Sequence, residues 1–238
     1  MTARSLHRSA VASQRGLSLV EMMVGIAVGL FIVAGASMLV TAQLGDNRRL
    51  LLETQIQQDL RATADIITRE LRRAGSVEDA VGLVWAPAGS ASSSHANVTI
   101  SAGLDEVGFE YERSANAGPW GFKLETRTIG SVDRGVIRTK LSTGGWQDLT
   151  DAFSLDVTDF RVEELSAVTE TLPCARACSA NLLDETCWPT LTVRTYEIEI
   201  AARAVSDANV RRSLRSTVRL RNDQLAFSAA LPASQACP

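Results

Sequence analysis

The residue with the clearest chemical meaning is Glu21, a single carboxylate near the start of a long apolar run. The stretch QRGLSLVEMMVGIAVGL spans residues 14–30, and Met22–Val40 carries no charge. An ionised carboxylate in hydrocarbon costs about 2.5–3.5 kcal/mol on insertion scales, so it is rarely retained without a function. A positive group beside it would offset part of that cost. Glu21 is therefore the first candidate functional residue, and ion pairing is its expected chemistry.

The apolar run has the length of a membrane-spanning helix, which needs about 20 residues. Arg4, Arg8 and Arg15 precede it without an acidic residue, which favours a cytoplasmic amino terminus. A secretory signal peptide cleaved after the VTA tripeptide at 40–42 is one alternative, although its apolar core normally has only about 7–15 residues. A static membrane anchor is a second alternative, and it leaves the glutamate without a function.

The rest of the chain holds no catalytic constellation. Its two histidines, His7 and His95, lie in the basic leader and in a serine-rich loop. No nucleophile elbow, phosphate-binding glycine loop or zinc-protease motif is present. Adjacent carboxylates such as Glu163-Glu164 are typical of solvated surface. We therefore expect a protein that is not an enzyme and that carries no cofactor.

Four cysteines fall late in the chain, in PCARACSANLLDETCWP and at the carboxyl terminus. They are Cys174, Cys178, Cys187 and Cys237. Their spacing is not that of a zinc site and no histidine lies nearby, so we expect no metal. In an oxidising compartment they would form two disulfides that tie a loop and the tail to the body. Four cysteines allow three pairings, and the sequence does not choose among them.

A strip of arginines is the third candidate site. In SLRSTVRLRN the apolar residues point to one side of a strand, and Arg215, Arg219 and Arg221 point to the other. Such a strip could contact DNA, an acidic neighbour or lipid head groups, or could simply be the solvated face of a strand. The solvated face is favoured, because lysines and interleaved aromatic residues are lacking. The chain's formal net charge of −3 also argues against nucleic-acid binding.

One long helix must position Glu21. Beyond the apolar run, apolar residues recur at helical spacing: Leu52, Ile56, Leu60, Ala64, Ile67 and Leu71. Polar residues form the opposite face: Thr54, Gln58, Arg61, Asp65, Arg69 and Arg72. Gly75 is expected at the C′ position that ends the helix. The sequence predicts a helix over about 17–74, apolar all round in its first half and amphipathic in its second.

Strand patterns dominate the rest of the chain. An entry loop over 76–97, with a short strand at Leu83–Ala86, leads into seven further segments. These are Val98–Ser101, Val107–Glu112, Phe122–Thr128, Val136–Leu141, Phe153–Glu163, Thr192–Ala202 and Leu214–Leu220. We expect one antiparallel sheet packed on the amphipathic half of the helix, which is an α+β fold.

The residues before and within the apolar run resemble a known signal. Arg15-Gly16 followed by Leu17-Ser18-Leu19-Val20-Glu21 is similar to the class III signal of type IV prepilins and pseudopilins. The resemblance implies that a prepilin peptidase cuts between Gly16 and Leu17 and that Leu17 becomes N-methylated. Glu21 would then be the fifth mature residue. Its pairing with the Leu17 amine of a neighbouring subunit would partly offset both desolvation costs and set the axial register.

The same resemblance divides the chain into three parts and implies a pilin-like fold. A leader covers 1–16, a transmembrane and assembly helix covers 17–75, and a β-rich head covers 76–238. Leu17 stands where phenylalanine is commoner. The helix-bending proline of many major pilins is absent, since residues 35–38 read GASM. Leu17 should be tolerated because it is also apolar, and the missing proline suits a subunit present in few copies.

Three further stretches narrow the resemblance. IITRELRRAG at 66–75, VTDFRVEEL at 157–165 and STVRLRN at 216–222 resemble the PilW group of minor pilins. J-type pseudopilins of type II secretion share a similar helix end and are the alternative within the superfamily.

The PilW resemblance implies a structural subunit that primes pilus assembly and sits near the fibre tip. Its partners would be the prepilin peptidase, other minor pilins, the major pilin and a PilY-type tip adhesin. The precursor would cross the inner membrane once, with its head in the periplasm. After assembly the subunit would be part of the extracellular pilus. Two alternatives of other classes are a DNA-binding pilin for uptake and a statically anchored periplasmic protein.

Overall fold

The computed structural model describes residues 16, 18–78, 95, 97–113, 116–142, 144–173 and 188–226. The chain divides into two compact units, one ending at Arg49 and one beginning at Leu50. The first unit contains the apolar half of a long helix. The second contains the rest of that helix and every described strand.

Helix α1 runs over Leu19–Leu71 without interruption, which confirms the predicted long helix with both ends shorter than expected. Its last turn tightens, because Arg73 and Ala74 donate to carbonyls only three residues back, at 3.0 Å each. Gly75 follows with a φ of 79°, a left-handed conformation that favours glycine. Its N–H donates to the carbonyl oxygen of Glu110 at 2.9 Å, so the residue that ends the helix is hydrogen-bonded to a strand of the head.

The second half of α1 is amphipathic as predicted. The buried helix residues are Ile56, Leu60, Thr63, Ala64, Ile67 and Leu71. All six residues of the predicted polar face are exposed. Because the apolar positions recur every three or four residues, they form one stripe, and this stripe lies in the hydrophobic core together with residues of both sheets.

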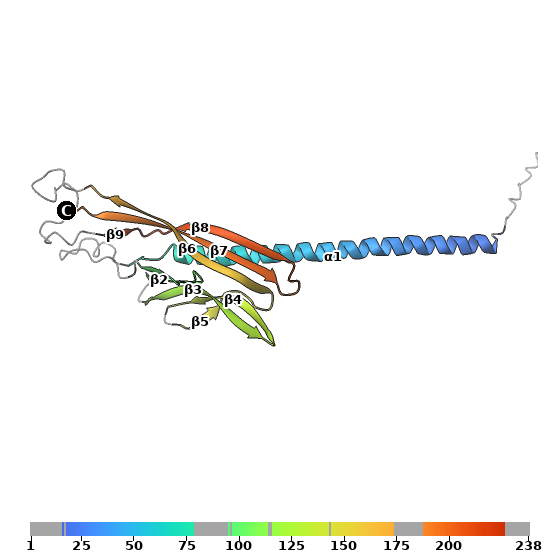
Figure 1. Ribbon diagram of the computed structural model, residues 1–238, viewed down its shortest axis with the longest axis horizontal. Helices are drawn as coiled ribbons and strands as arrows, with labels where there is room; N and C mark the ends of the chain where they lie inside the picture. Colours follow the sequence, from blue (N-terminus) through green and yellow to red (C-terminus); the bar gives the residue numbers. More distant parts are fainter. Residues whose placement is uncertain are drawn as a thin grey trace, which may run out of the picture. The chain divides into compact units, whose positions relative to one another are not determined.

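A five-stranded antiparallel sheet has the order β1-β2-β3-β4-β5. Its strands are β1 (Val98–Ile100), β2 (Glu106–Arg113), β3 (Asn116–Ile129), β4 (Val132–Lys140) and β5 (Trp146–Asp148). Consecutive strands pair throughout, so each connection is local. Figure 1 shows this sheet on one side of the second half of α1.

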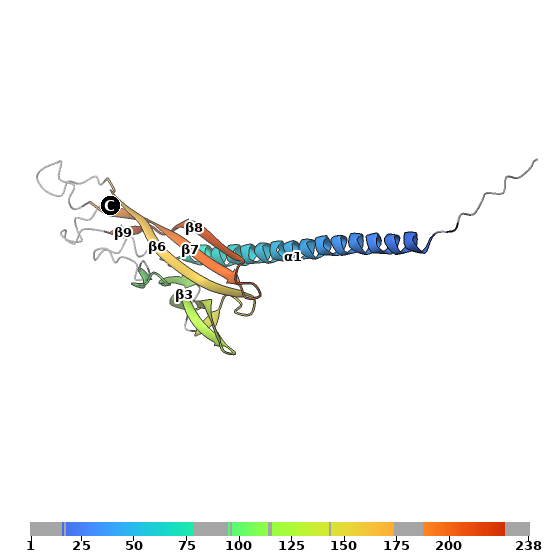
Figure 2. The same ribbon diagram turned by 45° about the vertical axis from the view of Figure 1, so that its right-hand side comes forward.

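A second, four-stranded antiparallel sheet has the order β6-β7-β8, with β9 also paired to β7. Its strands are β6 (Leu155–Thr171), β7 (Thr190–Ala204), β8 (Arg211–Arg219) and β9 (Gln224–Ala226). Alternate residues of β7 are buried from Arg194 to Ala204, as the alternating sequence predicts. Figures 1 and 2 show β6 and β7 crossing the same helix half and reaching the side on which the five-stranded sheet lies.

The expectation of one sheet is therefore wrong, and the head has two. All seven predicted strands after residue 97 exist, but β3 begins at Asn116 rather than Phe122, because Gly118, Pro119 and Gly121 weaken the strand signal there. The short strands β5 and β9 were not predicted, since three residues carry almost no periodicity. The predicted strand at Leu83–Ala86 lies outside the described residues.

The two sheets meet closely at Gly135 of β4. A Cβ placed there would lie 1.9 Å from the carbonyl oxygen of Val157, so only glycine fits. The Gly135 N–H donates to Oδ1 of Asp156 at 2.9 Å, and Nε of Arg203 donates to Oδ2 of the same carboxylate at 2.7 Å. Asp156 is buried, and these two bonds satisfy it while they join β4 to β6 and β7.

Candidate functional site

The candidate assembly segment begins where α1 begins. Ser18 is the helix N-cap: its Oγ accepts a hydrogen bond from the Glu21 N–H at 3.1 Å, and its carbonyl oxygen accepts one from the Met22 N–H at 3.1 Å. Glu21 consequently occupies the third helical position, where the helix dipole favours a negative charge. Ser18 was missed as a functional residue, although the S-x-x-E spacing of a capping box would have indicated it.

The predicted cleavage site precedes this cap. Gly16 is exposed, and a Cβ added to it would meet no atom within 4 Å, so the fold of the described residues does not require glycine there. A requirement for glycine would have to come from an enzyme that reads this position. Leu17, the predicted methylation site, lies outside the described residues.

The apolar half of α1 is exposed along its whole length, from Leu19 to Leu51. Phe31 is 80% exposed and Leu30 65% exposed, values that a helix covered by its own head would not show. This helix is long and apolar enough to cross a membrane, with a mean hydropathy of 2.4 over its best window. Its surface therefore needs a cover of lipid or of other helices.

Two features make the apolar half of α1 suitable for packing in lipid or against other helices. The glycines at 25, 29 and 35 have no neighbouring atom within 4 Å of an added Cβ, which leaves room for another helix to approach closely. The Thr41 hydroxyl donates to the carbonyl oxygens of Ser37 and Met38, the latter at 3.3 Å. A polar group is thus satisfied within the helix. Between Leu19 and Gly45 the charge of Glu21 is the only one.

The end of α1 is fixed by a polar cluster. The Tyr111 hydroxyl donates to Oε2 of Glu70 at 2.7 Å, and the Arg73 guanidinium lies 3.2 Å from both carboxylate oxygens. Burial, and then the hydrogen bond to Glu70, raise the pKa of Tyr111 to about 12. The ring of Tyr111 stacks on Trp120 with centroids 4.6 Å apart. This cluster adds an ionic and aromatic contact to the apolar packing that holds the head on the helix.

The carbonyls left over at the helix end are capped by the segment after β8. The Asn222 side chain donates to the carbonyl oxygens of Arg73 at 3.4 Å and Ala74 at 3.0 Å, and the Arg221 N–H donates to that of Arg72 at 3.3 Å. The stretches RELRRAG and VRLRN, which carried the resemblance, are therefore in contact. Sequence analysis singled out both but did not predict that they meet.

The predicted arginine strip lies on the exposed side of β8, with its apolar residues facing inward. Arg215 pairs with Glu197 and Glu199 of β7, at 3.5 and 3.0 Å. Arg219 pairs with Asp223 at 3.1 Å. Two of the three arginines are thus neutralised by carboxylates of β7 and of the turn before β9, an arrangement that suits a solvated strand face more than a row of contacts to nucleic-acid phosphates.

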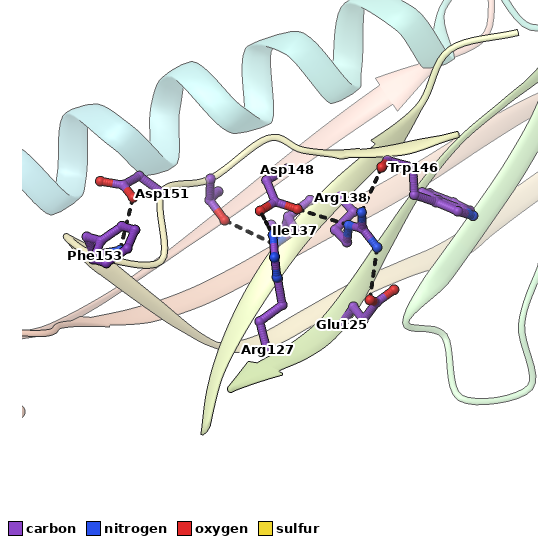
Figure 3. A network of polar contacts seen from close by, with 9 residues as sticks. Glu125, Arg127, Ile137, Arg138, Trp146, Asp148, Asp151 and Phe153 are labelled. Carbon is purple, nitrogen blue, oxygen red and sulfur yellow. Dashed lines mark hydrogen bonds and ion pairs between the residues drawn. The ribbon is translucent and has the colours of Figure 1, made fainter. Parts of the chain in front are cut away.

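A second charged network lies on the five-stranded sheet (Figure 3). Arg138 donates to Glu125 at 2.9 Å, to Asp148 at 3.0 Å and to the carbonyl oxygen of Trp146 at 2.7 Å, and Arg127 pairs with Asp148. The hydrogen bond from Lys123 is the largest cause that lowers the pKa of Glu125. Each of these charged groups has a partner of opposite sign, so the network holds β5 against β4 rather than offering a free base or nucleophile.

The cysteines and histidines are the remaining candidate residues. All four cysteines lie outside the described residues, so the predicted disulfides stay a prediction. His95 Nδ1 lies 3.1 Å from Oε2 of Glu110, and His7 is outside the described part of the chain. Within the described ranges, no group of three histidine, cysteine or acidic side chains gathers as metal ligands would.

Two protein-family models match the chain. Residues 49–220 match the family described as prepilin peptidase-dependent protein B, and residues 11–37 match the prokaryotic N-terminal methylation motif. The first match covers more than half of the chain, so the protein belongs to the prepilin peptidase-dependent protein B family, which is type IV pilin-like. No curated protein and no solved structure matched. The predicted superfamily is confirmed, and membership of the PilW group stays a prediction.

Proposed function

We propose that the protein is a structural subunit of a pilus-like fibre, made as a precursor that crosses the inner membrane once with its head in the periplasm. The prepilin peptidase cleaves between Gly16 and Leu17, and the new amine of Leu17 is methylated. The apolar half of α1 then leaves the bilayer and packs among similar helices. In the fibre core, Glu21 pairs with the Leu17 amine of a neighbour.

One observation supports this proposal above the others. The same helix packs its apolar stripe against its own head from Ile56 onward and is exposed on every side from Leu19 to Leu51, with one carboxylate at its capped start. Lipid tails and a bundle of apolar helices would both cover such a surface, so exchange between them has a modest net cost. The carboxylate fits the bundle better, because only there does it meet a fixed amine.

Within this class we propose a minor pilin that primes assembly near the fibre tip. α1 continues as regular helix through residues 35–38, where a major pilin often bends at a proline. The partners would be the prepilin peptidase, other minor pilins, the major pilin and a PilY-type adhesin. The protein would not be an enzyme and would bind no cofactor.

Three alternatives lead to different observations. A J-type pseudopilin would act in type II secretion, and its deletion would stop the secretion of exoproteins rather than the formation of surface fibres. A DNA-uptake pilin would bind DNA with a strongly salt-dependent affinity that drops when Arg215, Arg219 and Arg221 are replaced. A statically anchored protein would keep its leader, and a secreted one would begin at Gln43.

The deciding experiment is the mass of the amino-terminal peptide of protein purified from its native membrane. A peptide that begins with methylated Leu17 is the expected result. Gly16→Val is expected to keep the leader, since the fold leaves open space at Gly16 and the effect would come from the peptidase. Glu21→Gln is expected to be cleaved normally but to enter the fibre poorly. A mature terminus at any other residue contradicts the proposal.

A further inference from the structure

The outer edge of the second half of β6 pairs with no strand among the residues that the structure describes. β6 stands at the end of the order β6-β7-β8, and its last nine residues, Glu163–Thr171, are all exposed. Leu165 is 49% exposed and Val168 51% exposed. β7 covers the inner edge of this stretch as far as Thr171 (Figure 2). The outer edge is therefore a row of backbone groups open to another strand.

The backbone groups that face outward can be identified from the hydrogen bonds of the strand. The Val162 N–H points away from β7, because it donates to the carbonyl oxygen of Leu104 at 2.8 Å. A bulge between Glu164 and Ser166 then shifts the alternation by one residue. After the bulge, the Leu172 N–H donates inward, to the carbonyl oxygen of Pro189 at 2.8 Å.

Because backbone groups alternate in direction along a strand, counting back from the inward-facing Leu172 identifies the residues whose backbone groups face outward. Ala167, Thr169 and Thr171 must direct their N–H and C=O outward. The side chains agree with this register, since Oγ1 of Thr169 and Oγ1 of Thr192 are 3.0 Å apart, as expected for a pair that shares no backbone hydrogen bond. Three successive donor and acceptor sites at strand spacing are thus left without a partner among the described residues.

The charges of this edge select the kind of strand that would fit. Glu163, Glu164 and Glu170 are exposed, the stretch has no basic residue, and none of the three glutamates forms an ion pair with a described residue. Pairing of two copies of this chain edge to edge would gather six carboxylates on one short ribbon, which is unfavourable. A strand that carries lysine or arginine would instead be attracted.

We propose that the outer edge of β6, residues 163–171, is a docking site for an extended basic segment of a different subunit, which adds to the four-stranded sheet as a further strand. Backbone hydrogen bonds to Ala167, Thr169 and Thr171 give the affinity, and the three glutamates select the charge of the incoming strand. This inference rests on the proposed fibre function, because it supplies a contact by which a head would hold its neighbour.

The test is Thr169→Pro against Thr169→Val in the full-length chain, with incorporation into isolated fibres as the readout. Proline removes the outward N–H and blocks the approach of a strand but leaves the β6–β7 bonds intact. Valine removes the same hydroxyl and keeps the N–H. We expect incorporation to fall about tenfold for proline and to stay near wild type for valine, with unchanged circular dichroism for both. A folded Thr169→Pro protein that enters fibres like wild type overturns the proposal.

A charge test separates the kinds of occupant. The double variant Glu163→Lys/Glu170→Lys is expected to enter fibres about tenfold less, and Glu163→Gln/Glu170→Gln to be intermediate. Unchanged or higher incorporation of the lysine variant, or its appearance as a dimer, would mean that the strand is acidic or is a second copy, and either result overturns the proposal. Absence of the wild-type protein from fibres would instead contradict the proposed function itself.

Discussion

The two halves of α1 have the same secondary structure but opposite surroundings. Leu30 in the first half is 65% exposed, whereas Leu60 in the second is 1% exposed. An isolated helix gains most of its stability from packing of its apolar side. The second half therefore obtains its stability from its own head, and the first half must obtain it from lipid or from other subunits.

The sequence families divide the chain near the same place. The methylation-motif match ends at residue 37 and the prepilin peptidase-dependent protein B match begins at residue 49, close to the boundary of the two compact units at 49 and 50. One unit carries the pattern for processing and assembly, and the other carries the fold. Variants in the two halves should therefore affect different measurements.

The largest contrast is expected between Leu60→Ala and Leu30→Ala. Truncation of a fully buried leucine removes burial and leaves a cavity, so Leu60→Ala should lower the free energy of unfolding of the head by about 2–5 kcal/mol. Leu30→Ala removes the same atoms from an exposed position and should leave it unchanged. All four tryptophans lie in the second unit, so tryptophan fluorescence during urea unfolding in detergent micelles reports the head alone.

Incorporation into the fibre should depend on Leu30 even though the stability of the head does not. Leu30→Ala is expected to weaken incorporation while the head stays folded. If Leu30→Ala destabilised the head by as much as Leu60→Ala, the two halves would not be independent and the division at residue 49 would be wrong.

Alkaline pH should affect the second unit only. Both tyrosines, Tyr111 and Tyr196, lie there, and burial raises the pKa of each, to about 12 for Tyr111. The folded state holds these protons more tightly than the unfolded chain, whose tyrosines titrate near pH 10. The corresponding stability is complete below pH 10 and is lost as the pH rises from about 10 to about 12.

A spectrophotometric titration of tyrosinate checks this expectation. Tyr111 should not titrate near pH 10 in the native protein, and Tyr111→Phe should remove the transition near pH 12 and reduce the alkaline loss of stability. A transition near pH 10 in the folded wild type that Tyr111→Phe abolishes would show that Tyr111 is not buried against Glu70.

The helix was predictable from the sequence because its signals are local and periodic. The stripe from Ile56 to Leu71 recurs at the helical period over about four turns, and Gly75 ends it with a positive φ, as expected for C′. The candidate assembly segment was equally accessible, since Glu21 is the single charge of the apolar run and the residues that carry the prepilin resemblance, Gly16 among them, lie next to it in the sequence. Even Ser18, which was overlooked, has a local signature.

The arrangement of the head was not predictable in the same way. Strand patterns do not state which strands share a sheet, so two sheets were taken for one. The hydrogen bond from Asn222 to the carbonyl oxygen of Ala74, at the end of α1, joins residues that lie 148 positions apart, and no local sequence pattern predicts it. The free edge of β6 depends on the bulge at Leu165, because the bulge decides which N–H groups face outward.

The smallest effects are expected when the cap at either end of α1 is removed. Asn222→Ala removes the donors to the carbonyls of Arg73 and Ala74, and should lower the unfolding free energy of the head by about 1 kcal/mol. Ser18→Ala removes a bond of similar strength at the other end, but should leave the tryptophan-detected unfolding unchanged. Its effect should instead be local, with hydrogen exchange of the Glu21 amide faster by about fivefold in micelles. Because each cap belongs to a different unit, a loss of head stability in Ser18→Ala would show that the first half of α1 supports the head.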